Sequence, residues 1–151
     1  MIDLELLKYK ASLRLRKIGQ QPQIFDPIRR KWVAYQPEES VRQLFIAFCM
    51  TSGFCSSGRI SVERELEIHG MRRRYDIVLH DASGQPWMLV ECKAPSVTLS
   101  QSVMDQVARY NLALRVPYLL ITNGWATIAC HLDMEQQSYT YIDALPGSGA
   151  G

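Results

Sequence analysis

Two carboxylates and a lysine are spaced along this sequence as they would be at a single catalytic site. Asp76 lies within a strand-like run, and Glu91-Cys92-Lys93 closes the next such run. Because residues two apart in a strand share a face, Glu91 and Lys93 should point to one side and Cys92 into the opposite layer. Asp76 can meet them from the adjacent strand.

This set of side chains predicts phosphodiester hydrolysis. Two carboxylates on one face repel each other, and a divalent cation is the simplest means of keeping both ionised. Mg²⁺ suits such a site, with Mn²⁺ as a substitute, because it takes a few carboxylates and completes its shell with water and phosphate oxygens. Lys93 would orient the attacking water or stabilise the charge that develops on the phosphate.

The elements that must position these residues are predicted from hydrophobic periodicity and turn chemistry. Strand-like runs at 60–68, 72–80 and 87–93 form an antiparallel meander, and helical spacing predicts helices at 37–51 and 100–115. Further strands are predicted at 118–122, parallel to an earlier one, and at 125–132 and 139–142. Alternation in residues 12–16 predicts an amino-terminal β-hairpin or meander. In this order the elements predict an α/β sandwich with a mixed sheet.

Length and composition are those of one folded domain. The chain has 151 residues, 47% of them hydrophobic, which predicts a single domain over 1–146 and a flexible glycine-rich tail over 147–151. With 17 basic and 15 acidic residues, the net charge of +2 excludes a general basic coat, so any nucleic-acid footprint must be local.

The sequence predicts a soluble, cytoplasmic protein without a membrane partner. Its first residues lack the pattern of a secretory signal, and no apolar run approaches the roughly 20 residues that span a bilayer. The four cysteines form no Cys-x-x-Cys pair, which favours reduced thiols over a zinc site or a disulfide framework.

Residues 72–78, Arg-Arg-Arg-Tyr-Asp-Ile-Val, followed by residues 89–95, Leu-Val-Glu-Cys-Lys-Ala-Pro, resemble the PD-(D/E)xK motif of nucleases. More narrowly, residues from about 25 to 145 are similar to the amino-terminal nuclease domain of type I restriction enzyme R subunits and its small stand-alone relatives. The resemblance implies a restriction-endonuclease-like three-layer sandwich, in which helices flank a central mixed sheet. Tyr75 replaces the proline of the motif, a position that contributes no ligand.

The resemblance also implies roles for individual residues. Asp76 and Glu91 would bind the metal, with the backbone carbonyl of Cys92 as a further ligand, and Lys93 would be the catalytic lysine. Glu39, in preference to its neighbour Glu38, matches the first-helix acid that completes such sites through a water.

On the second helix, Gln106 and Tyr110 match the Gln-x-x-x-Tyr feature of RecB-like nucleases and would also belong to the catalytic set. They are one helical turn apart, so both can face one cleft. Tyr110 could stack on bases, as could Trp125, but aromatic residues at such spacing are more often core, and core is favoured for Trp125. Cys92 is better read as a small buried residue than as a nucleophile.

Several arginines are candidates for contact with DNA: Arg72, Arg73, Arg74 and Arg109. The run 72–74, like the run 29–31, serves equally well as a solvated strand end. Arg42 and Arg109 stand on predicted helices, where arginines usually pair with neighbouring acids.

Taken together, these features predict a magnesium-dependent endonuclease that acts on DNA. The alternative is a non-cleaving nucleic-acid-binding or assembly module of a larger restriction or repair complex. A purely structural role is disfavoured, because burying Asp76, Glu91 and Lys93 together without a ligand is costly. A homodimer would provide the two sites that double-strand cleavage needs. The sequence contains no Gly-x-x-x-x-Gly-Lys-Ser/Thr loop, so no ATP site is expected.

Overall fold

In the computed structural model, which describes residues 1–68 and 70–147, the predicted strands join into one six-stranded sheet of order β4-β5-β6-β7-β8-β9. Neighbouring strands are antiparallel except β6 and β7, which are parallel, as predicted. The strands and the two α-helices are β4 Ile60–Ile68, β5 Met71–His80, β6 Pro86–Cys92, α1 Pro37–Ser52, α2 Gln101–Leu112, β7 Tyr118–Thr122, β8 Thr127–Asp133 and β9 Ser138–Tyr141.

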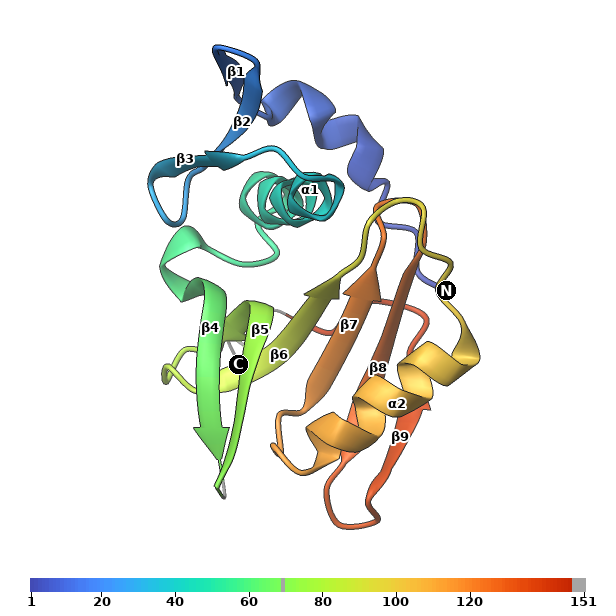
Figure 1. Cartoon of the computed structure of the whole chain (residues 1–151). Coiled ribbons are helices and arrows are strands. Elements are labelled where there is room, and N and C mark those ends of the chain that lie inside the picture. The colour runs from blue at the N-terminus through green and yellow to red at the C-terminus, as the bar shows by residue number, and fades with distance from the viewer. Residues whose placement is uncertain (69, 148–151) are drawn as a thin grey trace.

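The two α-helices cover opposite faces of this sheet and create two separate cores (Figure 1). Successive residues of β6 alternate between them: Val90 packs in the core that contains Phe45 of α1, and Leu89 in the core that contains Met104 of α2. All four side chains are fully buried. The predicted three-layer sandwich is therefore confirmed.

Each α-helix begins where the sequence predicts it. Pro37 occupies the first turn of α1, Glu38 and Glu39 lie near the positive end of its dipole, and Gly53 ends it with a φ of 77°. Ser100 caps α2, since its hydroxyl oxygen accepts a hydrogen bond from the Val103 N–H at 3.3 Å.

The amino-terminal segment forms a second, three-stranded antiparallel sheet, which confirms the predicted meander. Its strands are β1 Leu15–Ile18, β2 Gln21–Asp26 and β3 Lys31–Ala34. A 3₁₀ helix, Leu6–Ser12, precedes them and packs through Leu6 and Tyr9 on the α1 side of the large sheet. The sequence did not predict this helix, because a single 3₁₀ segment is too short to show a helical period.

The expectation that Trp125 belongs to the core is wrong, since 69% of this residue is exposed. The Asn123 side chain accepts hydrogen bonds from the N–H groups of Trp125 and Ala126, at 2.9 and 2.8 Å. This turn places Trp125 outside the sheet, before β8 begins at Thr127.

No helix among residues 1–68 and 70–147 combines the length and apolar character that crossing a bilayer requires. Apart from Gly147, the predicted flexible tail lies outside the described residues.

A buried polar pair ties β5 to α2. The Tyr75 hydroxyl donates a hydrogen bond to Oδ1 of Asn111, and both residues are fully buried. We expect Tyr75→Phe to lower the free energy of unfolding by about 1–3 kcal/mol, because it leaves the Asn111 oxygen unpaired. In the double variant Tyr75→Phe/Asn111→Leu much of this loss should be recovered. Urea denaturation measures both, and a double variant less stable than the single one would contradict the pairing.

Candidate active site

The structure brings Asp76 and the end of β6 together, as predicted. The ladder between β5 and β6 ends at the pair Ile77–Val90, and the next residues along the two strands are Asp76 and Glu91. Beyond the last backbone pair, a side-chain hydrogen bond joins the two strands: one Asp76 oxygen accepts the N–H of Cys92 at 2.7 Å. This hydrogen bond fixes Asp76 beside Glu91-Cys92-Lys93.

Cys92 points away from the site, as its alternation predicts. Its side chain is 1% exposed and belongs to the core on the α1 face, whereas Leu89, three residues earlier on the same strand, packs on the α2 face. Burial raises the pKa of the Cys92 thiol well above its ordinary value, and the negative charge of Asp76 adds to the shift. The thiol therefore stays protonated and is unsuited to act as a nucleophile.

Glu91 is a buried carboxylate with an incomplete set of partners. It is 8% exposed, and its Oε1 atom has no hydrogen-bond partner among the described residues. A guanidinium nitrogen of Arg73 lies 3.6 Å from that atom, too far for a hydrogen bond. Burial first, and then the charge of Asp76, raises the pKa of Glu91 to about 7, against the opposing effects of Arg73 and Lys93.

A cleft of about 550 Å³ opens beside these acids. Lys93 lines it from the end of β6, and Gln106 and Tyr110 line it from α2, so the structure brings these predicted residues together. Arg73 and Glu38 complete its polar lining. The guanidinium of Arg73 lies over the Tyr110 ring, 4.5 Å from the centroid.

The first-helix acid that faces this cleft is Glu38, whereas Glu39 points elsewhere. Burial, followed by the charge of Asp76, raises the pKa of Glu38, and Lys93 opposes the shift. Glu39 instead accepts hydrogen bonds from Arg29, Arg42 and Gln43. The sequence did contain a signal for this orientation. Glu38 precedes the core residue Val41 by three positions and therefore lies on the same face of the helix as Val41.

The predicted DNA-contacting arginines fall in different places. Only Arg73 faces the cleft. Arg72 and Arg74 are exposed but form ion pairs, Arg72 with Glu65 at 3.0 Å and Arg74 with Glu63 at 2.9 Å. Arg109 is exposed on α2 and is not part of the cleft lining.

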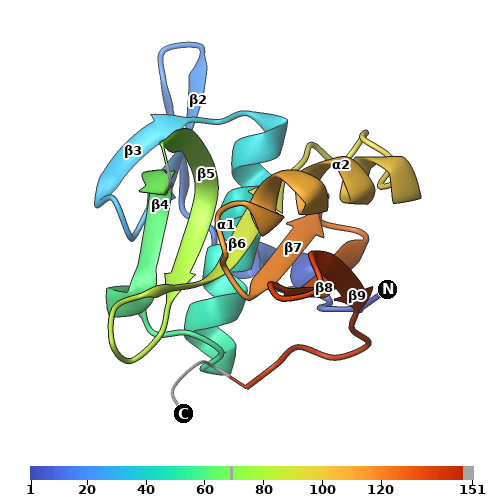
Figure 2. The same cartoon turned by 90° about the horizontal axis from the view of Figure 1, so that it is seen from below.

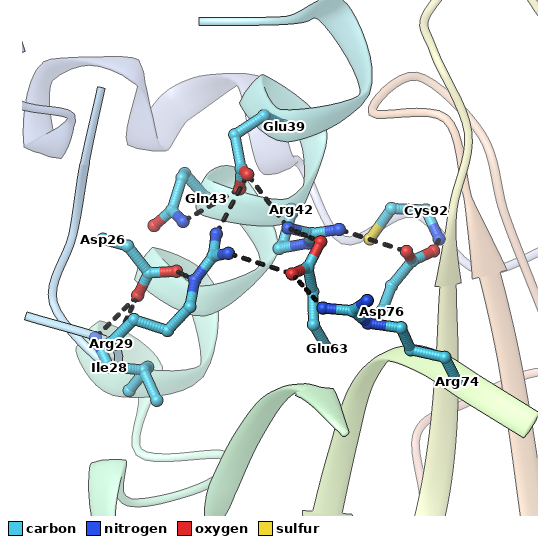
Figure 3. A network of polar contacts seen from close by, with 10 residues as sticks. All are labelled: Asp26, Ile28, Arg29, Glu39, Arg42, Gln43, Glu63, Arg74, Asp76 and Cys92. Atoms are coloured by element: carbon cyan, nitrogen blue, oxygen red, sulfur yellow. Dashed lines mark hydrogen bonds and ion pairs between the residues drawn. The ribbon is translucent and has the colours of Figure 1, made fainter. Parts of the chain in front are cut away.

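A network of buried and half-buried ion pairs connects Asp76 to the amino-terminal sheet (Figure 3). The second Asp76 oxygen accepts a hydrogen bond from Arg42 at 3.2 Å, and Arg42 also pairs with Glu39 at 2.9 Å. Glu39 in turn pairs with Arg29 at 2.9 Å, and Arg29 with the fully buried Asp26 at 2.6 Å. Of these ion pairs, the sequence alone indicates only the one between Arg42 and Glu39, which are one helical turn apart.

Glu63 joins this network through an unusual backbone conformation. Its φ is 53° in the middle of β4, and the ladder with β5 skips it between the pairs Val62–Ile77 and Arg64–Tyr75. A left-handed conformation is costly for a glutamate within a strand. Here it accompanies contacts of the Glu63 carboxylate with Arg29 at 3.3 Å and with Arg42 at 3.5 Å.

The residues present are compatible with a magnesium ion. Among the described residues no three His, Cys, Asp or Glu side chains gather as a ready-made metal site. Asp76 and Glu91 are nevertheless neighbours, and Glu91 has a buried oxygen without a partner. Two carboxylates that leave coordination positions for water and phosphate are the donor set that Mg²⁺ accepts.

Comparison with known proteins identifies the family of this chain. Residues 37–146 match the family model described as type I restriction enzyme R protein N terminus (HSDR_N). The chain belongs to this family. The matched segment of the HSDR_N family member contains both α-helices, the six-stranded sheet and every residue of the cleft, whereas β1–β3 precede it.

Among solved structures, the HSDR_N chain is similar to a fragment assigned to an HsdR subunit of a type I restriction enzyme from Vibrio vulnificus YJ016. The identity is 20% and the TM-score 0.39, over 59% of this chain and 19% of that chain. The chain therefore spans about a fifth of that fragment. A search of curated proteins found no significant match.

The raised pKa of Glu91 predicts how stability depends on pH. The folded protein binds this proton more tightly than the unfolded chain, so stability should fall as the pH rises from 4.5 to about 7. Glu91→Gln removes this dependence, and at pH 8 the variant should be more stable than the wild type by about 1–3 kcal/mol. The test is urea denaturation in EDTA at several pH values. A difference in stability between the wild type and Glu91→Gln that does not vanish towards pH 4 would contradict the raised pKa of Glu91.

The ion-pair network predicts that the loss of Arg42 destabilises the protein more than the loss of Arg72. Arg42→Met should lower the free energy of unfolding at pH 7 by about 3–5 kcal/mol, because Asp76 and Glu39 lose a buried counter-charge. Arg72→Gln, at an exposed ion pair, should cost less than about 1 kcal/mol. Urea denaturation compares the two, and similar losses for both variants would show that Arg42 is not the centre of the network.

Proposed function

We propose that this chain is a magnesium-dependent nuclease domain that hydrolyses DNA phosphodiester bonds. The observation that carries the proposal is the buried Glu91 carboxylate, held beside Asp76 with one oxygen unpaired. Leaving a buried acceptor unsatisfied costs about 1–3 kcal/mol, and a cation shared with Asp76 would supply the missing partner. Membership in a family of restriction enzyme subunits supports a nucleic-acid substrate.

Asp76 and Glu91 would hold the metal through their side chains, and Cys92 through its backbone carbonyl. Bound there, Mg²⁺ or Mn²⁺ would neutralise phosphate charge and lower the pKa of a water molecule. The Cys92 N–H keeps Asp76 in place at 2.7 Å, and this hydrogen bond leaves Asp76 lone pairs available. Arg73 provides a positive charge near the otherwise unpaired Glu91 oxygen.

Lys93 is the cation of the chain that is best placed to act on the scissile phosphate. It lines the cleft at the end of β6, one residue beyond the strand that positions Glu91. Its ammonium would orient the attacking water and stabilise the charge that develops on the phosphate oxygens. Gln106 and Tyr110 would contact the substrate from the α2 side of the same cleft.

Glu38 is the acid of α1 that we propose as the third member of the site. It lines the cleft with Lys93, and the charge of Asp76 affects its pKa. Glu39, with its oxygens bound by Arg29, Arg42 and Gln43, would act as a positioning residue that holds Arg42 against Asp76.

A second candidate function is that of a non-cleaving DNA-binding or assembly module within a larger restriction or repair complex, whereas a homodimer would serve the nuclease by providing two clefts for the two strands. The family is described as the amino-terminal part of an R protein, and this sequence has no Gly-x-x-x-x-Gly-Lys-Ser/Thr loop for ATP. Under this alternative the cleft would bind DNA but would need a partner for turnover.

The deciding experiment is a cleavage assay on plasmid, linear duplex and single-stranded DNA with Mg²⁺ or Mn²⁺. Lys93→Ala should reduce the rate at least about 100-fold, because it removes a charge that acts in the transition state. Glu38→Gln should slow cleavage more than Glu39→Gln, provided that both variants are folded by circular dichroism.

Two results would speak against the nuclease. Equal cutting by the wild type and Lys93→Ala would identify a contaminant, and an inert wild type that still binds DNA would favour the assembly module. Calorimetric titration with Mn²⁺ tests the metal site independently of cleavage, because Glu91→Gln should weaken metal binding whether or not DNA is cut.

A further inference from the structure

The positive charge of this chain is concentrated before the family-matched segment. Residues 1–35 contain eight lysines and arginines and three acids, a net charge of +5, whereas residues 36–151 contain nine and twelve, a net charge of −3. The overall charge of +2 therefore conceals a strong asymmetry. The basic part contains the β1–β3 sheet, and the acidic part contains the cleft.

The cations of the β1–β3 sheet are exposed and unneutralised. Within the part of the chain that the structure describes, none of the following residues forms an ion pair, and all are exposed: Arg14, Arg16, Lys17, Arg30 and Lys31. The arginines of the run 72–74 differ, because each pairs with a glutamate. The free positive potential is thus centred on the amino-terminal sheet.

Two of these arginines are stacked on aromatic rings of the same sheet. Arg14, Phe25 and Trp32 lie in one row across the three strands: the Phe25 N–H donates to the Arg14 carbonyl at 2.9 Å, and Phe25 pairs with Trp32. The Arg14 guanidinium lies 4.5 Å from the Phe25 centroid, and that of Arg16 lies 4.3 Å from the Trp32 centroid. The two rings contact each other edge to face at 5.3 Å.

This stacking orders the arginines while leaving their hydrogen-bonding edges available. Arg16 donates through Nε to Gln23 at 2.7 Å, and its terminal nitrogens have no partner within the described residues. A guanidinium held flat on a ring loses less side-chain entropy on binding and presents the planar fork that matches a phosphate. Aromatic rings beside such arginines can also stack on an unpaired base.

The sheet is also fixed next to the cleft. β3 ends at Ala34, and α1, whose first turn carries the cleft residue Glu38, begins at Pro37 (Figure 2). The ion pairs from Asp26 through Arg29 to Glu39 hold the turn after β2 against α1. A nucleic acid bound on the sheet would therefore be held near the cleft, whose lining carries Arg73 and Lys93 as well as Glu38.

We propose that the face of the β1–β3 sheet that bears Arg14 and Arg16 stacked on Phe25 and Trp32 binds the phosphate backbone of DNA. The proposal rests on the DNA substrate proposed above and names the surface that captures it. The cleft would perform the chemistry, and this basic face would supply most of the electrostatic affinity.

The test is the salt dependence of DNA binding by the full chain, measured in EDTA so that no cleavage occurs. Fluorescence anisotropy of a labelled duplex and of one of its single strands gives the affinity between about 50 and 200 mM salt. In Arg14→Gln/Arg16→Gln the affinity at about 0.1 M salt should fall about tenfold or more, and the slope of log affinity against log salt should become smaller by about two.

Two matched variants sharpen the result. Arg14→Lys/Arg16→Lys keeps both charges and should retain most of the salt dependence. Arg64→Gln/Arg72→Gln removes the same charge from two exposed positions of the β4–β5 hairpin and should bind nearly as well as the wild type. Circular dichroism and urea denaturation confirm that each variant is folded.

Three results would overturn the proposal: a wild type without salt-dependent binding, unchanged binding by Arg14→Gln/Arg16→Gln, or an equal loss in Arg64→Gln/Arg72→Gln. The outcome is separable from the proposed nuclease. A chain that cuts DNA with Mg²⁺ but ignores both arginines would refute only this surface. A chain that binds through them and never cuts would refute only the nuclease.

Discussion

The structure around the cleft depends on two hydrogen bonds to the Asp76 carboxylate. One oxygen accepts the Cys92 N–H at the point where the β5–β6 ladder ends, and the other accepts a hydrogen bond from Arg42 of α1. These two contacts join two strands and a helix at one side chain. Through Arg42 and Glu39 the same interaction reaches Arg29, so the amino-terminal sheet is linked to the site by charge as well as by the chain.

The charged groups around Asp76 are unevenly supplied with partners. Arg42 meets three carboxylates at once, although burial opposes its charge, and the attraction of Glu39 and Asp76 still raises its pKa. Glu91, only a strand away, is left with an unpaired oxygen and a pKa raised to about 7. Buried charges are tolerated when they are paired and hydrogen-bonded, and groups such as Glu91, whose counter-charge on Arg73 lies beyond hydrogen-bond distance, tend to gather at functional sites.

In the proposed nuclease, the carboxylates of the site and the cations of the amino-terminal sheet would have separate roles. Carboxylates are needed to hold a cation, but the same carboxylates repel phosphates before the cation arrives. A basic surface near the cleft would offset this repulsion and raise the local concentration of the proposed DNA substrate. Arg72 and Arg74 pair with glutamates, whereas Arg14 and Arg16 form no ion pair within the described residues, so the amino-terminal sheet carries more unpaired positive charge than the 72–74 run.

The order and type of the main elements were determined by the sequence itself, because period-two alternation, helical spacing and turn residues are local. Local pattern also placed Asp76 on the strand next to that of Glu91, since both strands were predicted as parts of one hairpin. Only the tertiary structure decided which acid of α1 faces the cleft. Glu39 had the better motif match, but arginines from other elements bind it and leave Glu38 on the cleft side. Likewise, the turn at Asn123 exposes Trp125 despite its apolar surroundings in sequence. Such outcomes depend on contacts between distant segments, and no local pattern carries that information.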